Sequence, residues 1–133
     1  MTDQKLNINI LLVEDDSVLR SIIAENLRNC GYAVMAAADG HDAYSQWLAT
    51  PDMFQVVVSD YHMPGMYGDK LRSRIYANCD ENERERPVFV IMSGAWAEAV
   101  GGKNSTSGFV AKPFEIAALH GMIQNLLAER RAA

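Results

Sequence analysis

The ten residues VVVSDYHMPG, at positions 56–65, indicate the fold most clearly. Its three consecutive valines predict a strand that is buried on both faces, as strands are in a parallel sheet covered by helices. The apolar run stops at a single carboxylate, Asp60, and the turn pair Pro64-Gly65 follows. A carboxylate in this place either forms hydrogen bonds within the turn or does chemistry, so the rest of the sequence has to decide its role.

Apolar runs of this kind recur along the chain and predict five strands, at residues 8–13, 33–38, 54–59, 88–92 and 109–111. Apolar residues at helical spacing predict the helices between and after them, at residues 17–30, 43–48, 69–77 and 115–130. The first helix has Asp16 or Ser17 as its cap and Gly31 after its end. Its predicted apolar positions are Leu19, Ile22, Ile23, Leu27 and Cys30. Residues 78–87 carry charges of both signs, which predicts a solvated loop.

Strands that alternate with helices predict βαβ units, right-handed crossovers and a parallel sheet with helices on both faces. More than one strand order suits such a sheet. In the flavodoxin-like order 2-1-3-4-5, strands 1 and 3 are neighbours and the ligand crevice lies at their carboxyl ends. We predict this α/β fold, a doubly wound five-stranded parallel sheet. It brings the polar residues that follow four of the apolar runs to one edge of the sheet, namely Glu14, Asp15, Asp60, Ser93 and Lys112.

One segment of the chain contains strong helix breakers between the fourth and fifth strands. Residues 100–105 read VGGKNS, and Gly-Gly disfavours a helix. We therefore predict a short or irregular fourth helix, at about residues 95–100, followed by a mobile loop.

The totals narrow the classes of function. With 133 residues the chain is long enough for one domain, with its core at about residues 7–130. A formal net charge of −5 argues against direct nucleic-acid binding. No apolar run approaches the roughly 18–20 residues of a membrane span, and the polar start is not a secretory signal. Cys30 and Cys79 match no metal or redox spacing, and a cytoplasmic location fits these features.

Three carboxylates gathered at one edge of a sheet repel each other, because two unit charges about 4 Å apart cost about 4 kcal/mol at an effective dielectric near 20. Such a cluster needs a proton, a cation or a lysine. An all-oxygen site with room for water suits Mg²⁺. Lys112 supplies a compact positive charge and Ser93 a hydroxyl donor. These are the parts needed for a carboxylate to accept a phosphoryl group.

The motifs ILLVEDD, VVVSDYHMPGMYG, VIMSG and GFVAKPF, in this order, resemble the receiver domain of bacterial two-component response regulators over nearly the whole chain. The resemblance implies that Asp60 is the phosphoacceptor and that Asp15 is the principal acidic ligand of Mg²⁺, with Mn²⁺ as a possible substitute. It implies that Glu14 acts through a metal-bound water and that the backbone carbonyl of His62 is a further ligand.

The resemblance also assigns residues around the phosphoryl group. Ser93, which stands where threonine is more frequent, and Lys112 would contact its oxygens. Phe109 stands at the position of the family's switch aromatic, which would move with Ser93 on phosphorylation. The bond between Lys112 and Pro113 would be cis. The spacing from Ser93 to Lys112 is a few residues shorter than is common in the family.

The expected function is that of a phosphoacceptor signalling domain. It would accept a phosphoryl group from a phosphohistidine on a sensor histidine kinase or a histidine phosphotransfer protein, and would then act on a downstream target or an output domain outside this chain. It would catalyse only its own phosphorylation and autodephosphorylation, so it is not expected to be an enzyme with a small-molecule product.

Three other functions are open to the same sequence. A haloacid-dehalogenase type phosphohydrolase needs an acid two residues after the nucleophile, where this chain has His62. A flavodoxin needs a phosphate-binding loop after the first strand, where Glu14, Asp15 and Asp16 would repel phosphate. A degenerate receiver would bind partners without phosphorylation, but every expected site residue is retained here.

Overall fold

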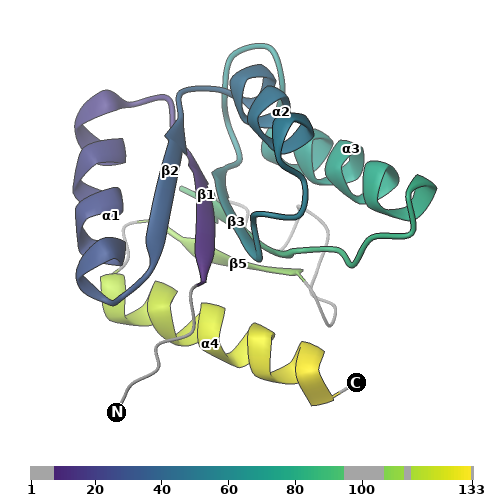
Figure 1. The fold of residues 1–133 in the computed structure, drawn as a ribbon. Coiled ribbons are helices and arrows are strands. Elements are labelled where there is room, and N and C mark those ends of the chain that lie inside the picture. Colours follow the sequence, from purple (N-terminus) through teal and green to yellow (C-terminus); the bar gives the residue numbers. More distant parts are fainter. Residues whose placement is uncertain (1–7, 95–106, 113–114, 133) are drawn as a thin grey trace.

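The structure of the protein is a computed structural model, which describes residues 8–94, 107–112 and 115–132 (Figure 1). Five parallel strands form one sheet in the order β2-β1-β3-β4-β5. The strands are β1 (Asn9–Val13), β2 (Ala33–Ala37), β3 (Val56–Asp60), β4 (Val88–Ser93) and β5 (Ser107–Ala111). The helices in the described part of the chain are α1 (Ser17–Asn29), α2 (Gly40–Ala49), α3 (Gly68–Glu81) and α4 (Ile116–Ala132). The predicted flavodoxin-like α/β fold and strand order are therefore confirmed.

The helices cover the sheet on both faces, with α1 and α4 on one and α2 and α3 on the other (Figure 1). Alternate residues of β1 point to opposite faces, so Ile10 and Leu12 pack with α1 and α4, whereas Leu11 and Val13 pack with α2 and α3. All four side chains are fully buried, as are the three valines of β3. The central strands thus form a rigid support for the residues at their carboxyl ends.

The predicted ends of α1 are confirmed. The Asp16 Oδ1 atom accepts hydrogen bonds from the backbone nitrogens of Val18 at 3.0 Å and Leu19 at 3.1 Å. At the other end, Gly31 has a φ of 106°, which suits glycine after a helix. The buried stripe of α1 is narrower than predicted, because Ile22 is 50% exposed and Cys30 is exposed. Each lies beside the stripe of Ile23, Ala24 and Leu27 rather than on it.

Helix α3 is longer than predicted and includes the first four residues of the predicted loop 78–87. The Trp47 side chain donates a hydrogen bond from Nε1 to the Asn78 Oδ1 atom at 3.0 Å, and Cys79 is fully buried. These tertiary contacts hold the last turn of the helix although its sequence is polar.

Several predictions lie outside the described residues. The short fourth helix and the loop that follows it fall within residues 95–106, and the proposed cis bond involves Pro113. The backbone of Phe109 pairs with Ile91 in the sheet, but its side chain is not among those described. None of the helices in the described part of the chain is long and apolar enough to cross a membrane.

Candidate functional site

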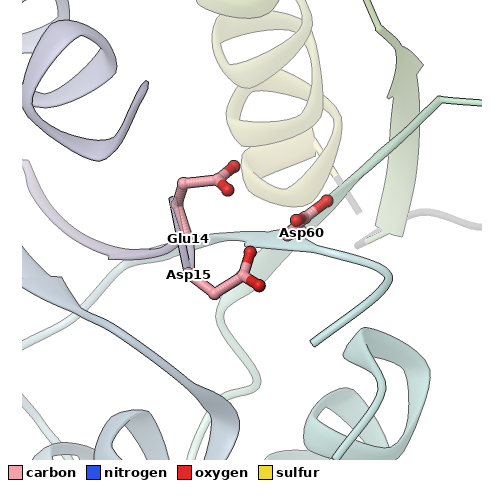
Figure 2. A group of neighbouring side chains, drawn as sticks. All are labelled: Glu14, Asp15 and Asp60. Carbon is pink, nitrogen blue, oxygen red and sulfur yellow. The ribbon is translucent and has the colours of Figure 1, made fainter. Parts of the chain in front are cut away.

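Three carboxylates meet at the carboxyl edge of the sheet. Strands β1 and β3 are neighbours with Val13 opposite Ser59, so Glu14 and Asp15 leave the sheet beside Asp60, the last residue of β3. The three residues each offer a carboxylate oxygen within 4.8 Å of the others (Figure 2). The predicted acidic cluster is therefore present, although 45 positions separate Asp15 from Asp60.

Two of these carboxyl groups are removed from water. The Glu14 residue is 1% exposed and Asp60 is 7% exposed, whereas Asp15 is exposed. Burial raises the pKa of the Glu14 carboxyl, and the hydrogen bond from the Asp16 amide and the charge of Lys112 oppose this rise. Burial also raises the pKa of Asp60, where Lys112 opposes the rise and Asp15 adds to it. The cluster therefore favours any positive charge that enters it.

Lys112 supplies such a charge. Its Nζ atom lies 3.0 Å from the Asp60 Oδ1 atom and 3.2 Å from the Glu14 Oε1 atom. Burial lowers the pKa of Lys112, but the bonds to the two carboxylates outweigh burial, so its pKa lies above the ordinary value. The Lys112 backbone nitrogen donates to the carbonyl of Ser93 at 2.7 Å. The Lys112 amine thus joins the ends of β1 and β3, and the Lys112 backbone is anchored at the end of β4.

Ser93 is the last residue of β4 and is 1% exposed. Strand β4 lies beside β3 with Met92 opposite Asp60, so Ser93 is one position beyond the carboxylate along the neighbouring strand. The structure therefore places all four strand ends that were predicted to form the site at one edge of the sheet.

An aromatic cluster lies directly after the carboxylate. The ring of His62 contacts those of Tyr61 and Tyr67, with centroids 4.8 Å and 5.4 Å apart, and the two tyrosine rings are 5.1 Å apart. The His62 side chain is exposed. The sequence analysis did not identify the two tyrosines, whose sequence signal was three aromatic rings in the seven positions after Asp60. Their contacts restrain the loop that contains the His62 carbonyl.

Gly68, the first residue of α3, was also missed. A Cβ atom at Gly68 would lie 2.5 Å from the carbonyl oxygen of Asp60 and 3.1 Å from the Cα atom of Tyr61. Its backbone nitrogen donates to the Tyr61 carbonyl at 2.8 Å, which keeps the helix start against the end of β3. The sequence signal was a glycine where a turn gives way to a helix. A side chain at position 68 would therefore have to displace the backbone that holds the carboxylate.

The Gly68→Ala variant is expected to lower the free energy of unfolding by about 2 kcal/mol, because a contact of 2.5 Å with a backbone oxygen forces the chain to move. The matched control is Gly121→Ala in α4, where a Cβ atom meets nothing within 4 Å. This control is expected to gain about 0.5–1 kcal/mol from helix propensity. Urea unfolding measures both, and equal effects in the two variants would contradict the steric reading.

The residues present suit a magnesium ion. Their donor atoms are all carboxylate oxygens, which hard divalent cations prefer, and the small number of protein ligands leaves positions for water. Two of the carboxyl groups are buried with raised pKa values, so a cation would also relieve the repulsion between them. Softer metals that select thiolate or imidazole ligands find no such donors within this cluster of described residues.

Comparison with known proteins identifies a family whose match to this chain includes all of these site residues. Residues 10–124 match the family model described as the response regulator receiver domain. The chain is 35% identical over 115 residues to the chemotaxis protein CheY-3 of Vibrio cholerae, which covers 85% of this chain and 86% of CheY-3. It is 30% identical over 126 residues to ARR21 of Arabidopsis thaliana, named as a two-component response regulator. That alignment covers 95% of this chain and 20% of ARR21, so the chain spans about a fifth of that protein.

Solved structures show the same fold. A response regulator receiver domain protein of Clostridium thermocellum superposes with a TM-score of 0.81 at 19% identity, covering 94% of this chain and 98% of that one. The receiver domain of the hybrid histidine kinase CckA superposes with a TM-score of 0.72 at 29% identity, covering 90% and 98%. The family model spans most of the chain and the carboxylates lie at the expected strand ends, so the chain belongs to the receiver domains of two-component response regulators.

Proposed function

We propose that this receiver accepts a phosphoryl group on Asp60 in a Mg²⁺-dependent reaction. The observation that carries the proposal is the placement of the Asp60 carboxylate, which ends a buried strand within the acidic cluster and lies 3.0 Å from the Lys112 ammonium. In the transfer, a carboxylate oxygen of Asp60 attacks phosphorus in line with the bond to a histidine nitrogen. That bond breaks, and its electron pair stays on the imidazole.

The surrounding residues have separate roles in this proposal. Asp15 and Asp60 would bind Mg²⁺ directly, Glu14 through a water, and the His62 carbonyl would complete the protein ligands; Mn²⁺ could replace Mg²⁺. The bound ion would neutralise negative charge on the oxygens of the transferring group. In support, the response regulator protein TrrA of Thermotoga maritima, which has the same fold at 20% identity, is known in complex with Mg²⁺-BeF.

Residues at or near the ends of β4 and β5 would bind the phosphoryl group and respond to it. Lys112 and Ser93 would donate hydrogen bonds to its oxygens, and movement of Ser93 together with Phe109 would shift a two-state equilibrium. The bond between Lys112 and Pro113 would be cis. Residues 7–130 would form the core of one receiver domain, which modifies only itself and turns over no small-molecule product.

The proposed phosphodonor is a phosphohistidine on a sensor histidine kinase or a histidine phosphotransfer protein, in the cytoplasm. In support, the receiver of Ssk1 from Saccharomyces cerevisiae, with the same fold, is known in complex with the histidine phosphotransfer protein Ypd1. The output would be a downstream target or a domain outside this chain.

The test is incubation with acetyl phosphate and Mg²⁺ followed by intact mass measurement. A gain of one phosphoryl group that requires the cation would support the proposal. No gain at saturating Mg²⁺ would favour the alternative, a degenerate receiver that binds partners without phosphorylation.

Magnesium is expected to stabilise the folded protein more at about pH 7 than at about pH 4.5. The raised pKa values of Glu14 and Asp60 mean that the folded state binds protons more tightly than the unfolded state. The stability of the metal-free protein therefore falls as the pH rises from about 4 through these raised values. A cation binds the deprotonated carboxylates and offsets that loss. Urea unfolding with and without Mg²⁺ measures the difference, and Glu14→Gln should reduce its pH dependence. Equal stabilisation at both pH values would argue against a cation among these carboxylates.

Helix α1 presents an apolar surface beside the proposed site. Val18 is 68% exposed and Ile22 is 50% exposed, and they lie four positions apart on a helix that begins two residues after Asp15. A protein phosphodonor has to bring its histidine against Asp60, so this surface would lie within its footprint.

The Ile22→Asp variant is expected to slow phosphoryl transfer from a histidine kinase that labels the native chain by about tenfold or more, because it places a charge within an apolar contact. Transfer from acetyl phosphate, which needs no docking surface, should be unchanged. Met53→Asp is the matched control. Met53 is 39% exposed and precedes β3, so it lies at the amino ends of the strands, whereas Asp60 lies at their carboxyl ends. Loss of transfer from both donors would instead indicate damage to the site.

A further inference from the structure

We infer that Arg20 is a positioning residue that holds Asp15 in place for the divalent cation. The inference rests on the proposed Mg²⁺ site and assigns to it a residue outside the cluster of carboxylates. Arg20 lies in the first turn of α1, seven residues after β1 ends at Val13, and the site motifs did not include it.

The guanidinium of Arg20 binds the chain at the acidic tip of β1. Its Nη1 atom donates a hydrogen bond to the carbonyl oxygen of Glu14 at 2.8 Å. This carbonyl belongs to the peptide unit that joins Glu14 to Asp15, so the bond fixes the orientation of that unit. The backbone nitrogen of Arg20 also donates to the Asp16 carbonyl at 2.8 Å, which fixes Arg20 itself within the first turn of α1.

The position of the Asp15 carboxylate depends on its backbone more than the positions of the other two carboxylates do. The Glu14 carboxylate accepts hydrogen bonds from the Asp16 amide at 3.1 Å and from Lys112 at 3.2 Å, and Asp60 pairs with Lys112. The Asp15 carboxylate is exposed and forms no hydrogen bond or ion pair with another described residue. Its place in the cluster is therefore set by the peptide unit that Arg20 holds.

The charge of Arg20 and its hydrogen bond to the Glu14 carbonyl have opposite expected effects on Mg²⁺ affinity. As a cation bound to the carbonyl between Glu14 and Asp15, Arg20 opposes the entry of another cation, so its loss by charge alone would tighten Mg²⁺ binding. As the residue that orients a ligand, its loss would weaken binding, and loss of such outer partners typically costs about 10–100-fold in metal affinity. The charge effect is reduced by solvent because Arg20 is only partly buried. We therefore expect the positional effect to decide the sign.

The chain offers a matched control on the same helix. Arg28 donates from its Nη2 atom to the Val34 carbonyl at 2.9 Å, so it also ties α1 to a backbone oxygen. That oxygen belongs to β2, away from the three carboxylates. Arg28→Ala therefore loses the same kind of hydrogen bond and the same charge from α1 without touching the acidic tip.

The experiment compares the native protein, Arg20→Ala and Arg28→Ala by calorimetric titration with Mg²⁺. We expect about tenfold weaker binding in Arg20→Ala and native affinity in Arg28→Ala. In the metal-free protein, amide hydrogen exchange at residues 15 and 16 should quicken in Arg20→Ala alone. The rate with acetyl phosphate should need more Mg²⁺ but reach the native plateau. If Arg20→Ala does not fold, Arg20→Met keeps the aliphatic stem and lacks the donor.

Unchanged or tighter Mg²⁺ binding in Arg20→Ala or Arg20→Met overturns the inference, as does an equal loss in Arg28→Ala. The proposed function fails separately, if the native protein gains no phosphoryl group. In that case the titrations still test the role of Arg20, because they do not depend on phosphorylation.

Discussion

Replacing Asp60 by asparagine is expected to abolish phosphoryl incorporation from acetyl phosphate, with a loss of at least about 100-fold. The amide keeps nearly the shape of the carboxylate at the end of β3 but cannot attack phosphorus to form an acyl phosphate. Folding should be little affected, because asparagine gives up the ion pair with Lys112 but also relieves the burial of a charge beside Glu14. Intact mass after incubation with Mg²⁺ and the phosphodonor measures the loss.

Asp16→Asn is the matched control for this substitution. Asp16 lies one residue beyond the cluster, and its carboxylate caps α1 through Val18 and Leu19. Asparagine is as good a cap as aspartate, so the variant should fold normally and gain its phosphoryl group at the native rate. A phosphoryl group that appears on Asp60→Asn, or disappears from Asp16→Asn, would place the acceptor elsewhere.

The fold could be predicted because its strands are nearly pure apolar runs. The valines at residues 56–58 are fully buried, and an acidic, hydroxyl or basic residue ends or directly follows four of the strands. A parallel sheet brings such ends together, so the site followed once the order of strands was chosen. The exposure of Ile22 could not be predicted in this way, because helical spacing does not distinguish a buried stripe from an apolar surface beside it.

Contacts that depend on the exact approach of two segments were not predictable. The extra turn of α3 depends on the bond between Trp47 and Asn78, which are 31 positions apart. The closeness of Gly68 to the Asp60 carbonyl, and the bond from Arg20 to the Glu14 carbonyl, depend on how the chain leaves each strand. A sequence motif records that a residue type is present but not the backbone oxygen it touches, so these residues were found only in three dimensions.

Removing the amine of Lys112 is expected to change cation binding and phosphoryl transfer in opposite directions. In Lys112→Ala, Asp60 and Glu14 lose a positive charge that lies 3.0 Å and 3.2 Å from their oxygens. A competing cation is gone, so Mg²⁺ should bind about tenfold more tightly. Two unit charges about 4 Å apart interact by about 4 kcal/mol at an effective dielectric near 20, which solvent at the partly exposed amine reduces.

The transfer reaction should nevertheless slow by about 100-fold at saturating Mg²⁺, because a donor aimed at the oxygens of the transferring group has been removed. Without Mg²⁺ the variant should also unfold at lower urea concentration, since the buried carboxylates keep their charges and lose their partner. Titration calorimetry, single-turnover labelling with acetyl phosphate and urea unfolding measure the three effects. Lys70→Ala, which removes an exposed amine from α3, should change none of them. Weaker Mg²⁺ binding in Lys112→Ala would mean that the amine organises the carboxylates for the ion rather than competing with it.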